Sequence, residues 1–571
     1  LAELTPQTIE TLNKGLPPTW SHANPVDIIG DAPAQRYGAT LKAVAADDGV
    51  DAVLVLNCPT GLASPLEAAQ GVAAVVEKGR INGKPVLACW LGEHTAEPAR
   101  KVLRQAGVAT FEAPAAAASA IGYLDGWSKA QVSLSQVPES GSADITGRVD
   151  EVRAIFRAAA AEGRSILTEP EAKSVLAAYE VSVPQILEAR TPAEVEQHAA
   201  TLLKDWDRVV VKLLSKAITH KSDVGGVKLN IETARGARES AEAIEARVRK
   251  ARPDADIEGY AVQPMVKMKD AHELILGVSR DPIFGPVVMF GAGGVAVEVV
   301  DDTAIGLPPL DDVLGEQLIE RTNIGKLLAG FRDRAPADRS AILRSLNAVS
   351  QMVVDFPCIA GIDVNPLLSG PQGAVALDAR IELDLTRIEE EGPNPDLAIR
   401  PYPSGWKKHI QSRQGQKYTL RPIRPADISL YSEFFKAVSS ADIRMRFLGY
   451  RKAFPDAMLK RLTQLDYDRE IAFVALDEEG RLAGISRLSA DPDHEVAEFG
   501  LLVRSDVQGQ GIGLALMSHL IDYGRADGLS RIEGIMFDEN DKMIELSREL
   551  GFAIVTHPDD MTLQLAVLDL K

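Results

Sequence analysis

The chain has 571 residues, of which 46% are hydrophobic and 25% are charged, and its formal net charge is −19. This length and composition are typical of a globular protein with several domains, and the negative charge argues against broad binding to nucleic acid or to anionic membranes. No apolar run reaches the roughly 20 residues that cross a bilayer, and three widely spaced cysteines predict reduced thiols in a cytoplasmic protein.

The first part of the chain alternates strand-like and helix-like stretches. Residues 1–23 are helix-like, and we assign them to the tail of a missing upstream subdomain. From residue 24 to 136, apolar runs at 51–57 and 84–91 alternate with alanine-rich stretches that are typical of helices. Continuous apolar strands between helices are typical of a parallel sheet covered on both faces. We therefore predict an α/β subdomain over residues 24–136.

The middle of the chain predicts a larger domain of mixed type. Residues 150–390 combine helical stretches with strand-like runs such as 208–214, and they include a glycine cluster at 291–294. Residues 391–417 contain several prolines and polar residues without periodicity, which is typical of an extended linker.

The last part of the chain, residues 418–571, begins with antiparallel strand patterns and continues with strand–helix units. A glycine-rich run, Gln-Gly-Gln-Gly-Ile-Gly at 508–513, stands between a strand that ends near Val503 and the next helix. Backbone N–H groups at a helix N-terminus bind anions, and glycine lets a phosphate approach. The spacing fits neither a dinucleotide-binding nor a Walker motif. We therefore expect a pyrophosphate of another ligand, the alternative being a flexible turn.

The spacing Gln-x-x-Gly-x-Gly, on this succession of strands and helices, resembles the acyl-CoA loop of the GCN5-related N-acetyltransferases (GNATs). The resemblance covers residues 418–571 and includes a later Asn and the Leu-Gly-Phe ending at 550–552. It implies a GNAT domain that uses acetyl-CoA as cosubstrate. The residues that it places at acetyl-CoA are Val503, Gln508, Gly509, Gln510, Gly511, Ile512, Gly513 and Asn540.

Acetyl transfer to an amine needs a base, because a lysine ammonium has a pKa of about 10.4. Strand alternation places Glu498 on one face with Gly500 and Leu502, as a carboxylate in an otherwise apolar strand. Partial burial would make it a better base at neutral pH. The alternative is a solvated glutamate on the strand face. The GNAT resemblance implies that Glu498 is the general base, and the absence of cysteine after residue 417 favours direct attack by the amine.

The middle domain carries residues suited to a nucleotide. Asn365 and Asp378, with Asp363 nearby, offer the oxygen ligands that Mg²⁺ on nucleotide phosphates prefers, and Lys212 offers a positive charge for those phosphates. These residues, with the strings at 220–226, 262–266 and 272–298, resemble the ATP-grasp domain of the ADP-forming acyl-CoA synthetases. The resemblance implies ATP contacts at Lys212, His220, Gln263 and Met265, and Mg²⁺ ligands at Asn365 and Asp378.

The α/β subdomain resembles the flavodoxin-like CoA-ligase subdomain that precedes ATP-grasp in fused synthetases. In working synthetases a phosphohistidine in another ligase subdomain relays phosphate and a Rossmann-like domain binds CoA, and neither is visible here. The complete layout resembles the bacterial Pat-type protein lysine acetyltransferases. It implies transfer of acetyl from acetyl-CoA to a protein lysine without ATP, with an acyl-CoA synthetase as partner and no synthesis of acyl-CoA.

Two alternatives stay open. The chain could be a true ADP-forming acyl-CoA ligase whose acetyltransferase domain is auxiliary. Its first two blocks could instead form a non-catalytic sensor that binds acyl-CoA or nucleotide and sets the transferase rate. An oligomer is compatible with either alternative, and the sequence names neither the target lysine nor the regulator.

Overall fold

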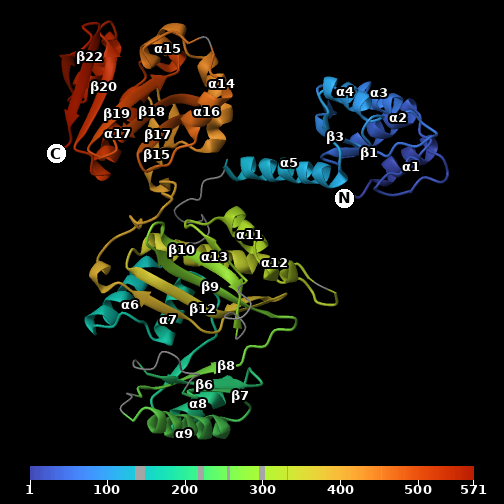
Figure 1. The fold of residues 1–571 in the computed structure, drawn as a ribbon. Coiled ribbons are helices and arrows are strands. Elements are labelled where there is room, and N and C mark those ends of the chain that lie inside the picture. Colours follow the sequence, from blue (N-terminus) through green and yellow to red (C-terminus); the bar gives the residue numbers. More distant parts are fainter. Residues whose placement is uncertain (135–147, 216–223, 254–256, 295–301, 331, 452) are drawn as a thin grey trace. The chain divides into compact units, whose positions relative to one another are not determined.

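The computed structural model describes residues 1–571 except 135–147, 216–223, 254–256, 295–301, 331 and 452 (Figure 1). The chain divides into two compact units, Leu1–Leu134 and Ser135–Lys571. Among the described residues, no helix is both long and apolar enough to cross a membrane.

The first unit is an α/β subdomain, as predicted. Strand β3 (Lys84–Trp90) pairs in parallel with β1 (Val53–Asn57) and β4 (Ala109–Phe111), and β2 (Arg80–Ile81) joins it antiparallel. Residues 86–90 of β3 are buried because helices cover the sheet. The helices are α1 (Pro6–Gly15), α2 (Ala34–Ala45), α3 (Pro65–Ala73), α4 (Glu97–Gln105) and α5 (Pro114–Leu134).

Helix α1 packs within this unit. The sequence had predicted that its residues belong to an upstream subdomain, and this prediction is wrong. Leu12 of α1 forms a cluster with Leu16 and Trp20, and Val26 and Val44 pack against that cluster. The alanine-rich segment forms helix α5, which is exposed over most of its length.

The first sheet along the chain in the second unit is small and antiparallel, with the order β5-β8-β6-β7. Helices α8 and α9 cover this sheet and share its core (Figure 1). Strands β6 and β8 are buried along their whole length. The elements are β5 (Leu187–Ala189), α8 (Pro192–Leu202), β6 (Val209–Leu214), β7 (Val227–Ile231), α9 (Ala234–Ala251) and β8 (Gly259–Pro264).

A larger antiparallel sheet of order β11-β10-β9-β12-β13, with β14 paired to β12, follows in the chain. Its strands are β9 (His272–Asp281), β10 (Gly285–Ala292), β11 (Thr303–Gly306), β12 (Ile359–Gly370), β13 (Gly373–Ala376) and β14 (Arg380–Leu383). The helices of this part are α6 (Val149–Ala161), α7 (Glu169–Ala178), α11 (Asp312–Glu320), α12 (Asn323–Leu328) and α13 (Arg339–Asp355). They share one apolar core with the sheet, so this part of the chain combines helices and strands, the mixed type that the sequence predicted.

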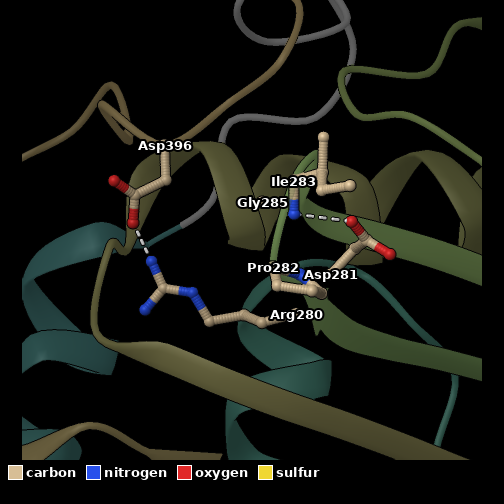
Figure 2. Close-up of a pocket in the computed structure, with 6 residues that line it drawn as sticks. All are labelled: Arg280, Asp281, Pro282, Ile283, Gly285 and Asp396. Atoms are coloured by element: carbon tan, nitrogen blue, oxygen red, sulfur yellow. Dashed lines mark hydrogen bonds and ion pairs between the residues drawn. The ribbon is translucent and has the colours of Figure 1, made fainter.

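The segment after this sheet is anchored to it. The backbone N–H of Asn394 donates to the carbonyl of Val354 at 2.8 Å, and Leu397 is buried in the core. Asp396 pairs with Arg280 beside the turn between β9 and β10, where these residues line a pocket (Figure 2). The charges of Arg280 and Asp396 neutralise each other, so the ion pair explains why charged side chains line this pocket.

The end of the predicted linker belongs to the last domain. Tyr402 is 1% exposed in that domain's core, and its hydroxyl donates to the carbonyl of Pro422 at 2.7 Å. Strand β15 (Lys408–Gln411) then pairs with β16 (Lys417–Pro422). The extended linker predicted over 391–417 is therefore wrong for its second half, because apolar anchors between the prolines fix the chain.

The last domain is built on an eight-stranded sheet of order β15-β16-β17-β18-β19-β20-β22-β21. Strands β19 and β20 run parallel, whereas the other neighbouring pairs run antiparallel. The remaining strands are β17 (Glu470–Asp477), β18 (Leu482–Ala490), β19 (Val496–Val503), β20 (Arg531–Phe537), β21 (Ala553–Thr556) and β22 (Leu563–Asp569). The helices are α14 (Ile428–Lys436), α15 (Ser440–Phe447), α16 (Asp456–Thr463), α17 (Ile512–Ala526) and α18 (Asp541–Glu549).

Candidate functional sites

The glycine-rich run forms the predicted turn between a strand and a helix. β19 ends at Val503, and α17 begins after Gly511, which is its N-cap residue. Gly509 and Gly511 have φ angles of +77° and +91°, a left-handed conformation that glycine adopts readily. No side chain caps the helix, and its first backbone bond runs from Ala515 N–H to Gly511. The N–H groups of residues 512–514 precede that bond and are suited to an anion.

The glycines of this loop have different roles. A β-carbon on Gly509 would meet nothing within 4 Å, so this residue borders open space. A β-carbon on Gly513 would instead lie 3.4 Å from Leu501 and 3.6 Å from Val503, on the side of the sheet. A side chain at Gly513 would therefore point at β19 and not at a pyrophosphate bound by the loop. Its backbone N–H is still available to an anion.

We expect Gly511→Val to raise the Kd for acetyl-CoA by about 10- to 100-fold, the loss that follows when charge-assisted hydrogen bonds fail to form. A β-branched residue at φ +91° must distort the loop that presents those N–H groups. Gly513→Ala is the matched control, and its Kd should change less than about twofold because the new methyl makes ordinary contacts. Calorimetric titration measures both, and normal affinity of Gly511→Val would place the anion elsewhere.

Two predicted ligand residues already have hydrogen-bond partners within the domain. The side chain of Gln508 donates to the carbonyl of Val503 at 3.3 Å and accepts from Lys542 at 3.0 Å. Asn540 is the N-cap of α18, where its side chain accepts from the N–H of Met543. Their contact with acetyl-CoA stays a prediction, since these bonds already explain both residue types.

The other two loop residues differ in exposure. Ile512 is 1% exposed in the core, so only its backbone faces a ligand. The side-chain oxygen of Gln510 is buried and has no hydrogen-bond partner within the described part of the chain.

Strands β19 and β20 pair over only a short length. Their register runs from Val496 opposite Arg531 to Glu498 opposite Glu533 and then ends. Beyond Glu498, β19 continues to pair with β18, so alternate backbone groups on its other side lack a strand partner. These unpaired backbone N–H and C=O groups are suited to hydrogen bonds with a ligand that contains amide groups. The glycine loop follows directly at the end of this open segment.

Glu498 lies where the pairing of β19 and β20 ends. Its side chain is exposed, so the predicted partial burial is wrong. The same face is covered further along β19, where Leu502 is buried against the helices of that side. Glu533 lies opposite Glu498 and is half-buried, with Arg531 3.4 Å from its carboxylate. Either glutamate could accept a proton from an amine at this point, and sequence reasoning overlooked Glu533.

A partly buried arginine adjoins Glu498. The guanidinium of Arg446, on α15, lies directly against Gly500, where any β-carbon would collide with it. Burial and the neighbouring Arg487 lower the pKa of Arg446, and Glu498 opposes them. A side chain at position 500 would therefore displace the guanidinium of Arg446.

The nucleotide residues gather around one buried carboxylate. Lys212, on β6, donates to Glu169 at 2.6 Å and to the carbonyl of Leu377 at 3.1 Å, and its amine lies 3.8 Å from Asp378. Lys173, one turn after Glu169 on α7, donates to Glu169 at 2.9 Å and to Gln263 at 2.8 Å. Helix α7 and strand β6 thus bring two lysines to one glutamate, and β8 contributes Gln263.

This buried network is tightly enclosed. The side chains of Glu169 and Lys173 are each 2% exposed, and that of Lys212 is 8% exposed. Burial and the adjacent Lys212 lower the pKa of Lys173 to about 8. Burial lowers the pKa of Lys212, but Glu169 and Asp378 outweigh it and raise the value. Sequence reasoning found Lys212 and Gln263 but overlooked Glu169 and Lys173, whose spacing of four on a helix was the available signal.

Asn365 lies on β12, and Asp378 lies in the short connection between β13 and β14. β12 and β13 pair with Leu367 opposite Ala376, and the N–H of Leu377 donates to Pro366 at 3.0 Å. The side-chain oxygen of Asn365 accepts from the N–H of Gly294 at 3.0 Å, and a carboxylate oxygen of Asp378 accepts from the N–H of Ala379 at 3.0 Å. These oxygens fit a Mg²⁺ ion that keeps water and phosphate as its other ligands, although the described residues contain no cluster of three His, Cys, Asp or Glu side chains for a metal.

Two further residues, Met265 and His220, were predicted to contact ATP. The N–H of Met265 already donates to the carbonyl of Arg208 at 2.8 Å, so a nucleotide would meet its side chain or carbonyl instead. His220 lies outside the described residues.

Comparison with known proteins identifies three parts of the chain. Three family models match: the Ligase-CoA domain at residues 1–134, the ATP-grasp domain at 158–383 and the acetyltransferase (GNAT) family at 441–552. The beta subunit of ADP-forming acetate–CoA ligase I from Pyrococcus furiosus is 36% identical over 236 residues, which cover 99% of that protein and 41% of this chain.

The chain belongs to the ADP-forming acyl-CoA synthetase family.

Unlike that subunit, this member of the synthetase family carries a GNAT domain at its C-terminus. An acetyltransferase of Pseudomonas aeruginosa is 36% identical to it over 151 residues, covering 81% of that protein and 26% of this chain. A solved structure of acetyl-coenzyme A synthetase 1 from Ca. Korarchaeum cryptofilum is 37% identical, covers 41% of this chain and 99% of that chain, and gives a TM-score of 0.39. The chain spans about half the length of the longer synthetases that it matches.

Proposed function

We propose that the ATP-grasp domain carries out the nucleotide-dependent step of an ADP-forming acyl-CoA ligase, in which an acid, CoA and ATP give acyl-CoA, ADP and phosphate. The observation that carries this proposal is the buried network of Lys212, Glu169 and Lys173 beside Asp378. Two ammonium groups lie here beside one buried carboxylate, and the carboxylate of Asp378, 3.8 Å from the amine of Lys212, is half-exposed. Nucleotide phosphates would bind beside these ammonium groups.

The roles of individual residues follow from this network. Lys212 would contact the phosphates, and Glu169 and Lys173 would hold its ammonium group in place. Asn365 and Asp378 would hold Mg²⁺, which, when bound, neutralises charge on the phosphates. The ligase activity of the relatives supports this function better than the expectation that the chain makes no acyl-CoA.

We further propose that the GNAT domain transfers acetyl from acetyl-CoA to a lysine ε-amine of a protein, with an acyl-CoA synthetase as the expected substrate. Two observations favour this second function: the uncapped helix at Gly511, and the carboxylate of Glu498 at the end of the β19–β20 pairing. The loop would hold the diphosphate, and the unpaired edge of β19 would bind the amide-containing arm. Glu498 would take the proton as the amine attacks the thioester.

Two reactions test these functions separately. With acetate, CoA and MgATP, the chain should form acetyl-CoA, ADP and phosphate; with acetyl-CoA and purified acetyl-CoA synthetase, it should form acetyllysine without ATP. Lys212→Met should abolish only the first reaction and Glu498→Gln should impair only the second. Absence of acetyl-CoA synthesis would contradict the ligase, and absence of acetyllysine would contradict the protein acetyltransferase.

A further inference from the structure

The turn that joins β15 to β16 touches the glycine loop. The backbone N–H of Arg413, in this turn, donates to the carbonyl of Gln510 at 3.0 Å. A β-carbon on Gly511 would lie 3.7 Å from Cγ and 3.9 Å from Nε of Arg413. The side chain of Arg413 therefore lies beside the N-cap of α17, where the uncapped N–H groups begin.

The turn is firmly built. The hydroxyl of Ser412 accepts from the N–H groups of Gln414 and Gln416 at 3.3 and 3.2 Å, and the N–H of Ser412 donates to the carbonyl of Gln416 at 2.8 Å. Earlier in the same segment, the carbonyl of Trp406 accepts from the ring of His519 on α17 at 2.9 Å. The segment before β16 is thus attached to the same helix whose N-terminus Arg413 approaches.

Other cations around the loop already have partners. Arg504 pairs with Asp506 at 2.7 Å, and Lys542 donates to Gln508 at 3.0 Å. Arg413 is exposed, and in the described part of the chain no hydrogen bond or ion pair engages its guanidinium. In a chain with a net charge of −19, a guanidinium held against an anion-binding loop without a carboxylate partner is suited to an anionic ligand.

We propose that Arg413 binds the diphosphate of acyl-CoA, so that a residue outside the region matched by the GNAT family model completes the donor site. This role depends on acyl-CoA being the ligand of the glycine loop, as proposed above. The diphosphate is preferred over the 3′-phosphate because the backbone of Arg413 is bonded to the loop that receives the diphosphate, and its side chain lies beside Gly511 of that loop. The guanidinium supplies paired N–H donors to phosphate oxygens that the helix N-terminus leaves free.

The test is calorimetric titration of the full chain with acetyl-CoA and with dephospho-acetyl-CoA, which lacks the 3′-phosphate. Arg413→Gln removes the charge but keeps the backbone bond to Gln510, and it should raise both Kd values by about tenfold. In acetyl transfer its KM should rise while kcat is kept. Lys408→Gln removes the same charge at the far end of β15 and should leave both values unchanged. Arg413→Lys should recover part of the affinity.

Each other result has a definite meaning. A loss seen with acetyl-CoA but not with the dephospho ligand would overturn the diphosphate assignment. Unchanged affinity of Arg413→Gln for both ligands, or an equal loss in Lys408→Gln, would overturn a specific role for Arg413. If the native chain bound neither ligand, the acetyl-CoA site itself would be wrong, which separates that failure from a failure of Arg413.

Discussion

Replacing Glu498 with glutamine should lower kcat for acetyl transfer by about 10²–10⁴, the range for loss of a general base, while the Kd for acetyl-CoA is nearly kept. Glutamine keeps the shape of the side chain but cannot take the proton of the attacking amine. Because Glu498 is exposed, the change should leave the fold intact. Steady-state kinetics at neutral pH with a protein substrate measures the effect.

Glu533→Gln is the matched control for this experiment. It changes the same group on the neighbouring strand, directly opposite Glu498. Glu533 lies beside Arg531 and is half-buried, whereas no partner within the described residues pairs with Glu498. We therefore expect the larger loss of kcat in Glu498→Gln. A larger loss in Glu533→Gln would move the base to β20, and an unchanged rate in both variants would contradict a carboxylate base here.

Replacing Glu169 with glutamine should destabilise the ATP-grasp domain by about 3–5 kcal/mol, the cost of breaking a buried ion pair. The change leaves the ammonium groups of Lys173 and Lys212 buried side by side, with the half-exposed Asp378 as the nearest carboxylate. MgATP binding should be lost with it, because Lys212 is no longer held in position. Hydrogen exchange followed by mass spectrometry should show faster exchange in peptides from β6 and β8.

Glu188→Gln provides the control, since Glu188 is an exposed carboxylate on β5 of the same small sheet. It should change local stability by less than about 0.5 kcal/mol. Hydrogen exchange in β6 and β8 of Glu169→Gln could instead be as slow as in the native chain, with MgATP still bound. The buried network would then have no role in either stability or nucleotide binding.

Two parts of the candidate sites, the glycine turn before α17 and the strand that carries Lys212, were predicted from short sequence patterns. The glycines at 509 and 511 marked a turn between strand and helix, and the structure has β19 end at Val503 and α17 begin at Ile512. The apolar run around Lys212 likewise predicted the buried strand β6. Each of these features is set by neighbours within a few residues, which a single sequence displays.

Features that depend on distant contacts were not predictable. Glu169 and Lys212 lie 43 residues apart, and nothing local indicates that one carboxylate serves two lysines. Arg413 follows a proline-rich stretch in which the buried residues, such as Tyr402, do not recur with the period of a helix or a strand. The sequence therefore did not indicate that this stretch is folded. Strand alternation gave the face of Glu498 correctly, but it could not show that the helices covering Leu502 leave Glu498 exposed.

The most direct test of the account is a crystal structure of the chain with acetyl-CoA. We predict that the diphosphate accepts hydrogen bonds from the N–H groups of residues 512–514, with Arg413 beside it, and that the thioester lies next to the unpaired segment of β19, within reach of Glu498. A diphosphate bound away from the N-terminus of α17, or a thioester on the opposite side of the sheet from Glu498, would contradict the account.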